Sequence, residues 1–273
     1  MPELPEVETT RRGIEPYLLG HKVHHVQIRE KRMRWPVDDA VQKISGHMIQ
    51  GVQRRAKYIL ITCNAGTLLL HLGMSGSLRI CPHELALKKH DHFIISIDGG
   101  MEMRLHDPRR FGAVLWHDVS EGSITEHPLL RHLGPEPLVD GFNPDYLAAS
   151  CKGRKTSIKQ HMMNNKVVVG VGNIYASEAL FRSGIRPTRK AGNIAKTRLA
   201  RLTTEIKQVL TESIKQGGTT LRDFLREDGK PGYFKQKLNV YDREGEPCRQ
   251  CLASIKKTTI SNRSTYFCPK CQT

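Results

Sequence analysis

The sequence contains no long apolar segment, and this shortage excludes two classes of protein. No run approaches the roughly 18 apolar residues that cross a bilayer, so a membrane-spanning protein is excluded. The N-terminal residues MPELPEVETTRRG lack the apolar core of a signal peptide. We therefore expect a cytoplasmic location.

Cysteines are too few for a small disulfide-stapled protein, since the chain has seven among 273 residues. Hydrophobic residues make up 38% of the sequence, which is enough for a substantial core. At roughly 150 residues per domain, a chain of this length is expected to form two domains.

Acidic residues are scarce relative to basic ones, and the imbalance lies in one half of the chain. The 43 Lys and Arg residues exceed the 27 Asp and Glu residues, which gives a formal net charge of +16. Residues 1–130 contain 17 basic and 15 acidic side chains, whereas residues 131–273 contain 26 and 12. Such a basic second half indicates a polyanionic partner, such as nucleic acid or an anionic membrane surface.

The pattern of apolar residues predicts an α+β protein. Val7, Ile14 and Leu18 lie among charged residues and indicate an amphipathic helix that ends near Gly20. The β-rich runs that follow are short and separated by turn residues, which is typical of an antiparallel sandwich or barrel. The expected strands are 23–28, 58–62, 67–72, 92–97, 103–106 and 113–117.

Beyond residue 130 the pattern changes from β-rich to helical. Residues 127–147 hold four of the 14 prolines and indicate an interdomain connection. Helical spacing follows at 158–164, 174–183 and 195–216. We expect a β-sandwich domain at 1–130, a linker at 131–150, a helical domain at 151–235 and a cysteine-rich segment at 236–273.

Four cysteines near the C-terminus have the spacing of a metal site. Cys248 and Cys251 form one CxxC pair, and Cys268 and Cys271 form a second pair 16 residues further on. This spacing predicts a zinc ribbon with one structural Zn²⁺, because thiolates fill all four tetrahedral positions. A redox dithiol or disulfides are the alternatives, and the paired spacing and a reducing compartment disfavour both.

The N-terminus contains the elements of an amine-based catalyst. Removal of Met1 would leave Pro2 as a secondary amine, and an N-terminal amine with a pKa near ~8 is partly neutral at physiological pH. Glu3 and Glu6 are three residues apart, so we expect both carboxylates on one helix face beside that amine, as acid and base. Acidic residues that complement the helix dipole, and a proline that favours a helix start, are the alternative interpretation.

Five motifs, in order along the chain, resemble the bacterial formamidopyrimidine-DNA glycosylase family. They are MPELPEVET, HLGMSG, DPRRFG, VVGVGNIYASE and the four-cysteine ribbon, and the resemblance extends from Met1 to Thr273. It implies a catalytic β-sandwich domain, a helix-two-turn-helix domain and a zinc ribbon. It also implies a bifunctional DNA repair enzyme that removes 8-oxoguanine opposite cytosine and formamidopyrimidines, then cuts the strand by β- and δ-elimination.

The resemblance also implies catalytic roles for individual residues. Pro2 matches the Schiff-base nucleophile, Glu3 the general acid and Glu6 its partner in the same pocket. Lys57 matches a lysine that contacts the phosphates of the lesion and assists elimination. Arg263, near the tip of an expected hairpin, matches a phosphate clamp that we include in the catalytic set.

Other matched positions are expected to contact DNA. A glycosylase must extrude its target base and fill the gap that remains, and Met74, Arg109 and Phe111 match the residues that fill it. Core packing is the alternative for Met74 and Phe111, although their Gly-flanked loops favour exposure. Residues 218–232 match a loop that covers the everted base. Further matched DNA contacts are His90, Arg154, Asn173 and Tyr241.

Two positions depart from the family pattern. Leu252 replaces a glycine that usually follows the first CxxC pair, and Asp242 replaces a common glycine in VYGR. Because Leu disfavours a positive φ, we expect altered turn geometry there, and weaker DNA binding before any loss of activity.

Three functions remain compatible with the sequence. The first is the oxidised-purine glycosylase, and the second is an endonuclease VIII-like relative that prefers oxidised pyrimidines. The third is a non-catalytic zinc-ribbon DNA-binding protein. The motif set favours the first, with damaged double-stranded DNA as the partner. We expect a monomer with a nucleoid-associated location and no membrane partner. We expect no nucleotide cofactor, since GVG lacks the third glycine of a dinucleotide loop.

Overall fold

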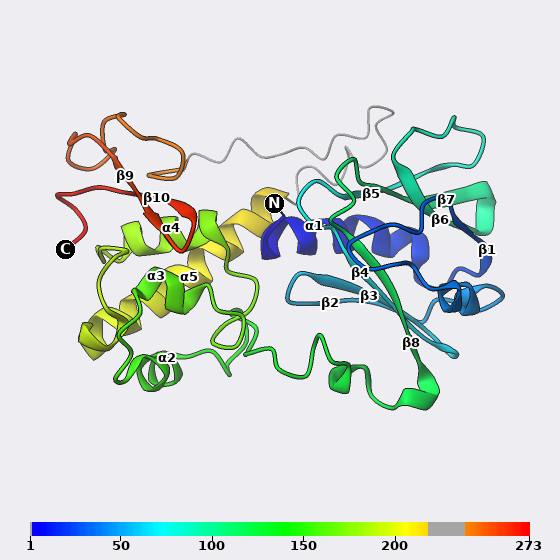
Figure 1. Cartoon of the computed structure of the whole chain (residues 1–273), viewed down its shortest axis with the longest axis horizontal. Helices are drawn as coiled ribbons and strands as arrows, with labels where there is room; N and C mark the ends of the chain where they lie inside the picture. Colours follow the sequence, from blue (N-terminus) through cyan, green and yellow to red (C-terminus); the bar gives the residue numbers. More distant parts are fainter. Residues whose placement is uncertain (1, 218–237) are drawn as a thin grey trace. The chain divides into compact units, whose positions relative to one another are not determined.

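The computed structural model describes residues 2–217 and 238–273, and the chain divides into two compact units. Among the described residues, the first unit contains 2–131 and 214–217, and the second contains 132–213 and 238–273. Figure 1 shows the β-strands of the first unit and the helices of the second. Within these ranges, none of the helices combines the length and apolar character needed to cross a membrane.

The first unit begins with helix α1 (Leu4–Leu18). Glu3 is the N-cap, and Pro5 in the first turn has no N–H to leave unpaired. Val7, Ile14 and Leu18 are buried in the core, as the helical spacing predicts. The helix stops before Gly20, which adopts a φ of +79°.

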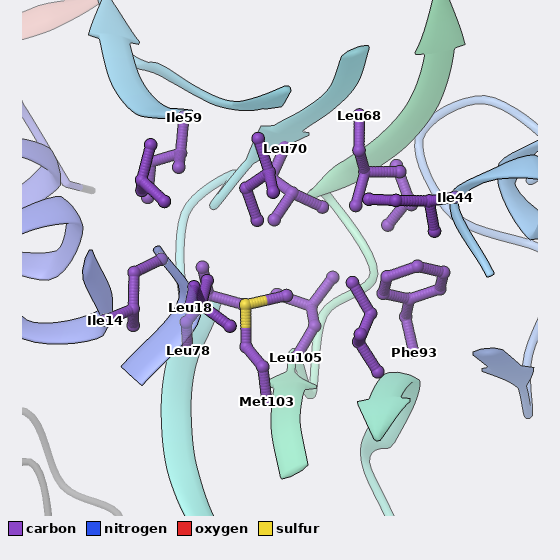
Figure 2. Close-up of a cluster of buried hydrophobic side chains, with 14 of the residues drawn as sticks. Ile14, Leu18, Ile44, Ile59, Leu68, Leu70, Leu78, Phe93, Met103 and Leu105 are labelled. Atoms are coloured by element: carbon purple, nitrogen blue, oxygen red, sulfur yellow. The ribbon is translucent and has the colours of Figure 1, made fainter. Parts of the chain in front are cut away.

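Two four-stranded antiparallel sheets complete the first unit. One sheet has the order β1-β6-β7-β5 and the other β2-β3-β4-β8. Apolar side chains from both sheets meet in one core, which α1 also lines (Figure 2). The strands are β1 (Val23–Ile28), β2 (Gly51–Arg55), β3 (Tyr58–Cys63), β4 (Gly66–His71), β5 (Ser77–Pro82), β6 (Asp91–Ile97), β7 (Met101–His106) and β8 (Ala113–Asp118).

The structure confirms the α+β class and the six expected strands, and adds β2 and β5 to them. Both added strands carry arginines, which hide the alternation that marks a strand. In β5, Arg79 is buried because it donates to the buried carboxylate of Asp91. Short 3-10 helices lie at Asp39–Ile44, Asp98–Gly100, Val119–Glu121 and Ile124–Glu126 in this unit and at Ala191–Asn193 in the second.

The second unit is helical, with a small hairpin near its C-terminal end. The helices are α2 (Pro144–Cys151), α3 (Ile158–Met162), α4 (Asn173–Arg182) and α5 (Lys196–Gly217). Helix α2 begins inside the proline-rich stretch that the sequence suggested was irregular. Pro144 occupies its first turn and Asn143 caps it by accepting from the Tyr146 N–H at 2.9 Å, so this proline starts a helix.

The hairpin consists of β9 (Lys256–Ile260) and β10 (Arg263–Phe267), joined by a two-residue turn. Ser261 and Asn262 in this turn have φ values of 48° and 58°, as a tight primed turn requires. A separate small hydrophobic core at this end of the unit includes Val240, Ile255 and Phe181 of α4.

Candidate active site and nucleic-acid interface

Pro2 and Glu3 are buried at the start of α1, and Glu3 is only 2% exposed. The Glu3 N–H donates to Glu6 Oε2 at 2.8 Å, while the Glu3 side chain accepts from the Glu6 N–H. Each side chain thus accepts from the backbone N–H of the other residue in a capping box, and the two carboxylates do not share a helix face, since Glu3 lies just outside the helix. This arrangement fixes the backbone and the side chain of Glu3, the residue that follows Pro2, while Met1 lies outside the described residues.

A buried carboxylate that the sequence did not single out attaches α1 to the Lys57 hairpin. Glu8 Oε2 accepts from Arg54 Nε of β2 at 3.0 Å, and Arg54 Nη1 donates to the carbonyl oxygen of Ala56 at 2.8 Å. Burial raises the pKa of Glu8. Hydrogen bonds and charge from its arginine partners, Arg11 foremost, lower it by a larger amount. The pKa of Glu8 is therefore below its ordinary value, and the carboxylate remains ionised. Ala56, at φ 53°, and Lys57 form the turn between β2 and β3. The position of Lys57 is therefore set from the first helix.

His71 lies between this hairpin and the Met74 loop. It pairs with Tyr58 across β3 and β4, with the two rings 5.0 Å apart, and its Nδ1 accepts from the Gly73 N–H at 2.9 Å. Burial, then the positive charges of Arg34 and Lys57, lower the pKa of His71 from 6.5 to about 4. The imidazole is therefore neutral at physiological pH.

This lowered pKa predicts that acid destabilises the first unit. Below pH 6.5 the unfolded His71 takes up a proton that the folded one refuses, so its contribution to stability is lost as the pH falls towards 4. Between pH 7 and pH 5, we expect wild type to lose about 2 kcal/mol more unfolding free energy than His71→Asn, which keeps an acceptor for Gly73. Urea titrations followed by tryptophan fluorescence test this, because Trp35 and Trp116 both belong to this unit. An equal loss in both proteins, with the exposed His25→Asn as control, would contradict the assignment.

Met74, Arg109 and Phe111 are exposed on two loops of the first unit. Met74 is 41% and Phe111 45% exposed, which excludes core packing for both. The Arg109 guanidinium lies 4.8 Å from the centre of the Phe111 ring, in cation–π geometry. Met74 on one loop and the Arg109–Phe111 pair on the other are therefore exposed to solvent.

His90 is half-buried behind the Arg109 loop. Its ring packs edge to face against His92 and His106, each 5.8 Å away, and its carbonyl oxygen accepts from the Asp107 N–H at 2.9 Å. These contacts fix the backbone at Asp107, where the Arg109 loop begins after β7.

In the second unit, the structure brings Asn173 and the Arg263 hairpin together. Asn173 begins α4, and its Nδ2 donates to the carbonyl oxygen of Ser264 at 2.9 Å. Its Oδ1 is buried and accepts no hydrogen bond from the described part of the chain. Lys159, which sequence reasoning missed, is buried and donates to Thr265 Oγ1 at 2.8 Å. Exposed Arg263 thus projects from a hairpin that α3 and α4 both support.

Glu178 of α4 anchors the segment that carries Tyr241, and it is only 3% exposed. Its Oε2 accepts from the N–H and Nδ2 of Asn239 at 2.8 and 2.9 Å, and its Oε1 from the N–H groups of Val240 and Tyr241 at 2.9 and 3.0 Å. The Glu lies in GNIYASE, but helical periodicity alone does not reveal that its partners lie more than 60 residues away. Predicted contact Arg154 is exposed and donates to the Ser150 carbonyl at 3.3 Å.

Both departures from the family pattern adopt the backbone that glycine would favour. Leu252 has a φ of 62° and is 78% exposed, and Asp242 has a φ of 58°. The Leu252 N–H still donates to the Cys248 carbonyl at 3.0 Å, so the expected distortion of the turn is absent. Asp242 Oδ1 accepts from the Tyr266 hydroxyl at 3.2 Å.

The four ribbon cysteines form a site that fits Zn²⁺. All four sulfurs lie within 4.8 Å of one another, with Cys248 and Cys271 at 3.9 Å and Cys251 and Cys268 at 3.4 Å. Tetrahedral Zn–S bonds of ~2.3 Å separate sulfurs by about 3.8 Å, which matches this cluster. Backbone N–H groups donate to the sulfurs of Cys248 and Cys268 at 3.4 Å, as in zinc knuckles. The residues therefore hold one structural zinc, in agreement with the sequence prediction.

Loss of this metal is expected to unfold the ribbon, since its hydrophobic core is small. Cys268→Ser should lower the zinc content from about one ion per chain to a small fraction of that, because three thiolates bind far more weakly than four. The β9–β10 hairpin should then become sensitive to trypsin. Metal analysis and limited proteolysis check this, with buried Cys151→Ser as control. Full zinc content in Cys268→Ser would contradict the four-cysteine site.

The sheet unit with its capped N-terminal carboxylates, the helical unit and the four-cysteine ribbon together define the class of zinc-ribbon DNA glycosylases. Three family models match in order: the formamidopyrimidine-DNA glycosylase N-terminal domain at residues 1–114, its H2TH domain at 133–225, and a zinc finger found in FPG and IleRS at 245–273. The chain belongs to the formamidopyrimidine-DNA glycosylase family. The expected helix-two-turn-helix domain is confirmed by this match.

Relatives align along the whole chain. It is 58% identical over 273 residues to formamidopyrimidine-DNA glycosylase from Thioalkalivibrio sulfidiphilus, with both chains fully covered, and 54% identical over 272 residues, again with full coverage, to the Escherichia coli protein. The Thermus thermophilus MutM (Fpg) structure is similar at a TM-score of 0.84 and 37% identity, covering 99% of this chain and 98% of that one. A Lactococcus lactis Fpg complex with abasic-site DNA has a TM-score of 0.88 at 30% identity, with 99% of each chain covered.

Proposed function

We propose that the chain is a bifunctional DNA glycosylase and abasic-site lyase that removes 8-oxoguanine opposite cytosine and formamidopyrimidines. The observation that carries the proposal is the buried Pro2 followed by Glu3, whose backbone and side chain are fixed by Glu6. Once Met1 is removed, Pro2 supplies a secondary amine, and the adjacent carboxyl group supplies a proton donor.

The reaction begins when the Pro2 nitrogen attacks C1′ of the damaged nucleotide. The N-glycosidic bond breaks, the base leaves with its electron pair, and Glu3 supplies the proton that neutralises it. The C1′–O4′ bond of the sugar then breaks, O4′ leaves with its electron pair and takes up a proton, and the Pro2 nitrogen and C1′ form an iminium ion. The iminium ion draws electrons from C2′, so loss of a C2′ proton expels the 3′ phosphate. A second elimination expels the 5′ phosphate, and water then hydrolyses the Schiff base. Glu6 holds Glu3 in place, and Lys57 contacts the phosphates and assists elimination.

Damaged double-stranded DNA is the inferred partner. The Lactococcus lactis relatives were solved with DNA that contains an abasic site or an N7-benzyl-Fapy-dG. Met74, Arg109 and Phe111 fill the gap left by the extruded nucleotide, which their exposure on two loops supports. We assign phosphate contacts to Asn173 and Arg263, and further DNA contacts to His90, Arg154 and Tyr241. The loop expected at 218–232 lies outside the described residues.

The remaining parts of the proposal concern charge, state and location. The basic second half of the chain would neutralise phosphates, so binding weakens steeply as salt rises. We expect the enzyme to act as a monomer in the cytoplasm, associated with the nucleoid.

The lesion preference is tested with matched duplexes that contain 8-oxoguanine opposite cytosine or thymine glycol opposite adenine. We expect strand incision of the 8-oxoguanine duplex at a rate at least about tenfold higher, because the Met74, Arg109 and Phe111 set matches the purine-specific relatives. Faster incision of thymine glycol would favour the endonuclease VIII-like alternative. Binding without incision of either would favour the non-catalytic DNA-binding protein.

A further inference from the structure

The loops that carry Met74 and Arg109 meet at one buried carboxylate, that of Asp107. Its Oδ1 accepts from Ser75 Oγ at 2.9 Å and from the Arg109 N–H at 3.3 Å, while Oδ2 accepts from the Gly112 N–H at 2.8 Å. Asp107 has no exposed surface. One charged group therefore receives donors from both loops, and its cost of burial is offset by three hydrogen bonds.

The backbones of the two loops also touch, so their spacing has little freedom. Gly73 has a φ of +63°, and a Cβ there would lie 2.4 Å from the carbonyl carbon of Phe111. A Cβ on Gly112 would lie 2.8 Å from the carbonyl oxygen of His71. Close contact without side chains allows the Ser75 hydroxyl to reach the carboxylate on the other loop.

We propose that the Ser75–Asp107 hydrogen bond is a latch that holds the two gap-filling loops at a fixed spacing, with Asp107 as a positioning residue. This inference rests on the proposed function. Met74 and the Arg109–Phe111 pair must enter the same opening in the duplex, and side chains from separate loops can do so together only if their separation is set before DNA binds. Neither Ser75 nor Asp107 needs to touch DNA for this role.

Ser75→Ala isolates the latch, because it removes the hydrogen bond between the loops and leaves the bonds of Asp107 within its own loop. We expect single-turnover excision of 8-oxoguanine from duplex DNA to fall about tenfold. Cleavage of an abasic site in single-stranded DNA should be unchanged, because there is no opposite strand and no gap to fill. Ser120→Ala is the matched control, since it removes a hydroxyl–carboxylate bond of 2.7 Å to Asp118 elsewhere in the same unit.

Asp107 variants separate positioning from a purely structural role. Asp107→Ala should reduce duplex excision more than Ser75→Ala does. Asp107→Asn should restore part of the activity, because its amide can accept from the Gly112 N–H and donate to the Ser75 hydroxyl, while the Arg109 N–H loses its acceptor at 3.3 Å. Equal losses on duplex and single-stranded substrates in Ser75→Ala, or no loss on the duplex, would overturn the latch. A wild-type protein inactive on both substrates would instead overturn the proposed function, and the latch with it.

Discussion

Replacing Glu3 by glutamine is expected to slow excision of 8-oxoguanine by about a hundredfold to ten-thousandfold, the usual contribution of a positioned general acid. Glu3 follows Pro2 in the chain, is buried and is fixed by the capping box, and in the proposed mechanism its carboxyl group gives its proton to the departing base. Glutamine has the same shape and keeps an oxygen that accepts from the Glu6 N–H, so the start of α1 should remain folded. What is lost is the transferable proton.

The expected loss is specific to base removal. A preformed abasic site has no base to protonate, so Glu3→Gln should cleave it at a rate much closer to wild type. Glu15→Gln is the matched control, because Glu15 lies on the same helix and forms a half-buried ion pair of 2.8 Å with Arg11. Single-turnover kinetics on both substrates measure the difference. Unchanged excision in Glu3→Gln would remove Glu3 from the mechanism.

The second large effect is expected for Glu178→Gln, which should weaken binding to abasic-site duplex by about tenfold to a hundredfold. The carboxylate accepts four hydrogen bonds from Asn239, Val240 and Tyr241, and glutamine would turn an N–H₂ group towards two of those donors. Each buried donor left unsatisfied costs about 1–3 kcal/mol. The segment that carries Tyr241 should therefore move away from α4, and the proposed DNA contact should be lost.

Fluorescence anisotropy with labelled duplex at fixed salt measures this change. Glu246→Gln is the control, since Glu246 pairs with Arg243 at 2.7 Å near the same segment but is exposed. Hydrogen exchange of the Val240 and Tyr241 amides reports the local opening independently of DNA. Wild-type affinity together with unchanged exchange would show that the four hydrogen bonds do not hold this segment.

Sequence patterns predicted the elements whose apolar residues repeat regularly. Helices α1, α4 and α5 and six strands fall close to the expected ranges, and the CxxC spacing predicted a cluster that the structure assembles. Strand β5 was missed because Arg79 looks like an exposed residue until its partner Asp91 is known, 12 positions along the chain. Helix α2 was missed because Pro144 resembles a breaker and acts as a helix start.

The candidate site was predictable where its chemistry is local. Pro2, Glu3 and Glu6 are neighbours in sequence, and the motif loops of Met74 and Arg109 carry glycines that indicate exposure. Long-range partners were not predictable from periodicity. Glu8 with Arg54, Asp107 with Ser75, and Glu178 with the 239–241 segment each join residues more than 30 positions apart. These buried carboxylates join distant segments of the chain, and only the folded chain shows which donors they receive.

Reductive trapping shows whether the Pro2 amine is the group that attacks the damaged nucleotide. The zinc-loaded protein, with removal of Met1 verified by mass spectrometry, is incubated with an 8-oxoguanine duplex and sodium borohydride, and the linked peptide is sequenced. We predict a covalent protein–DNA adduct at the nitrogen of Pro2. An adduct at Lys57 or another lysine, or base excision without any trapped adduct, would show that Pro2 is not the nucleophile.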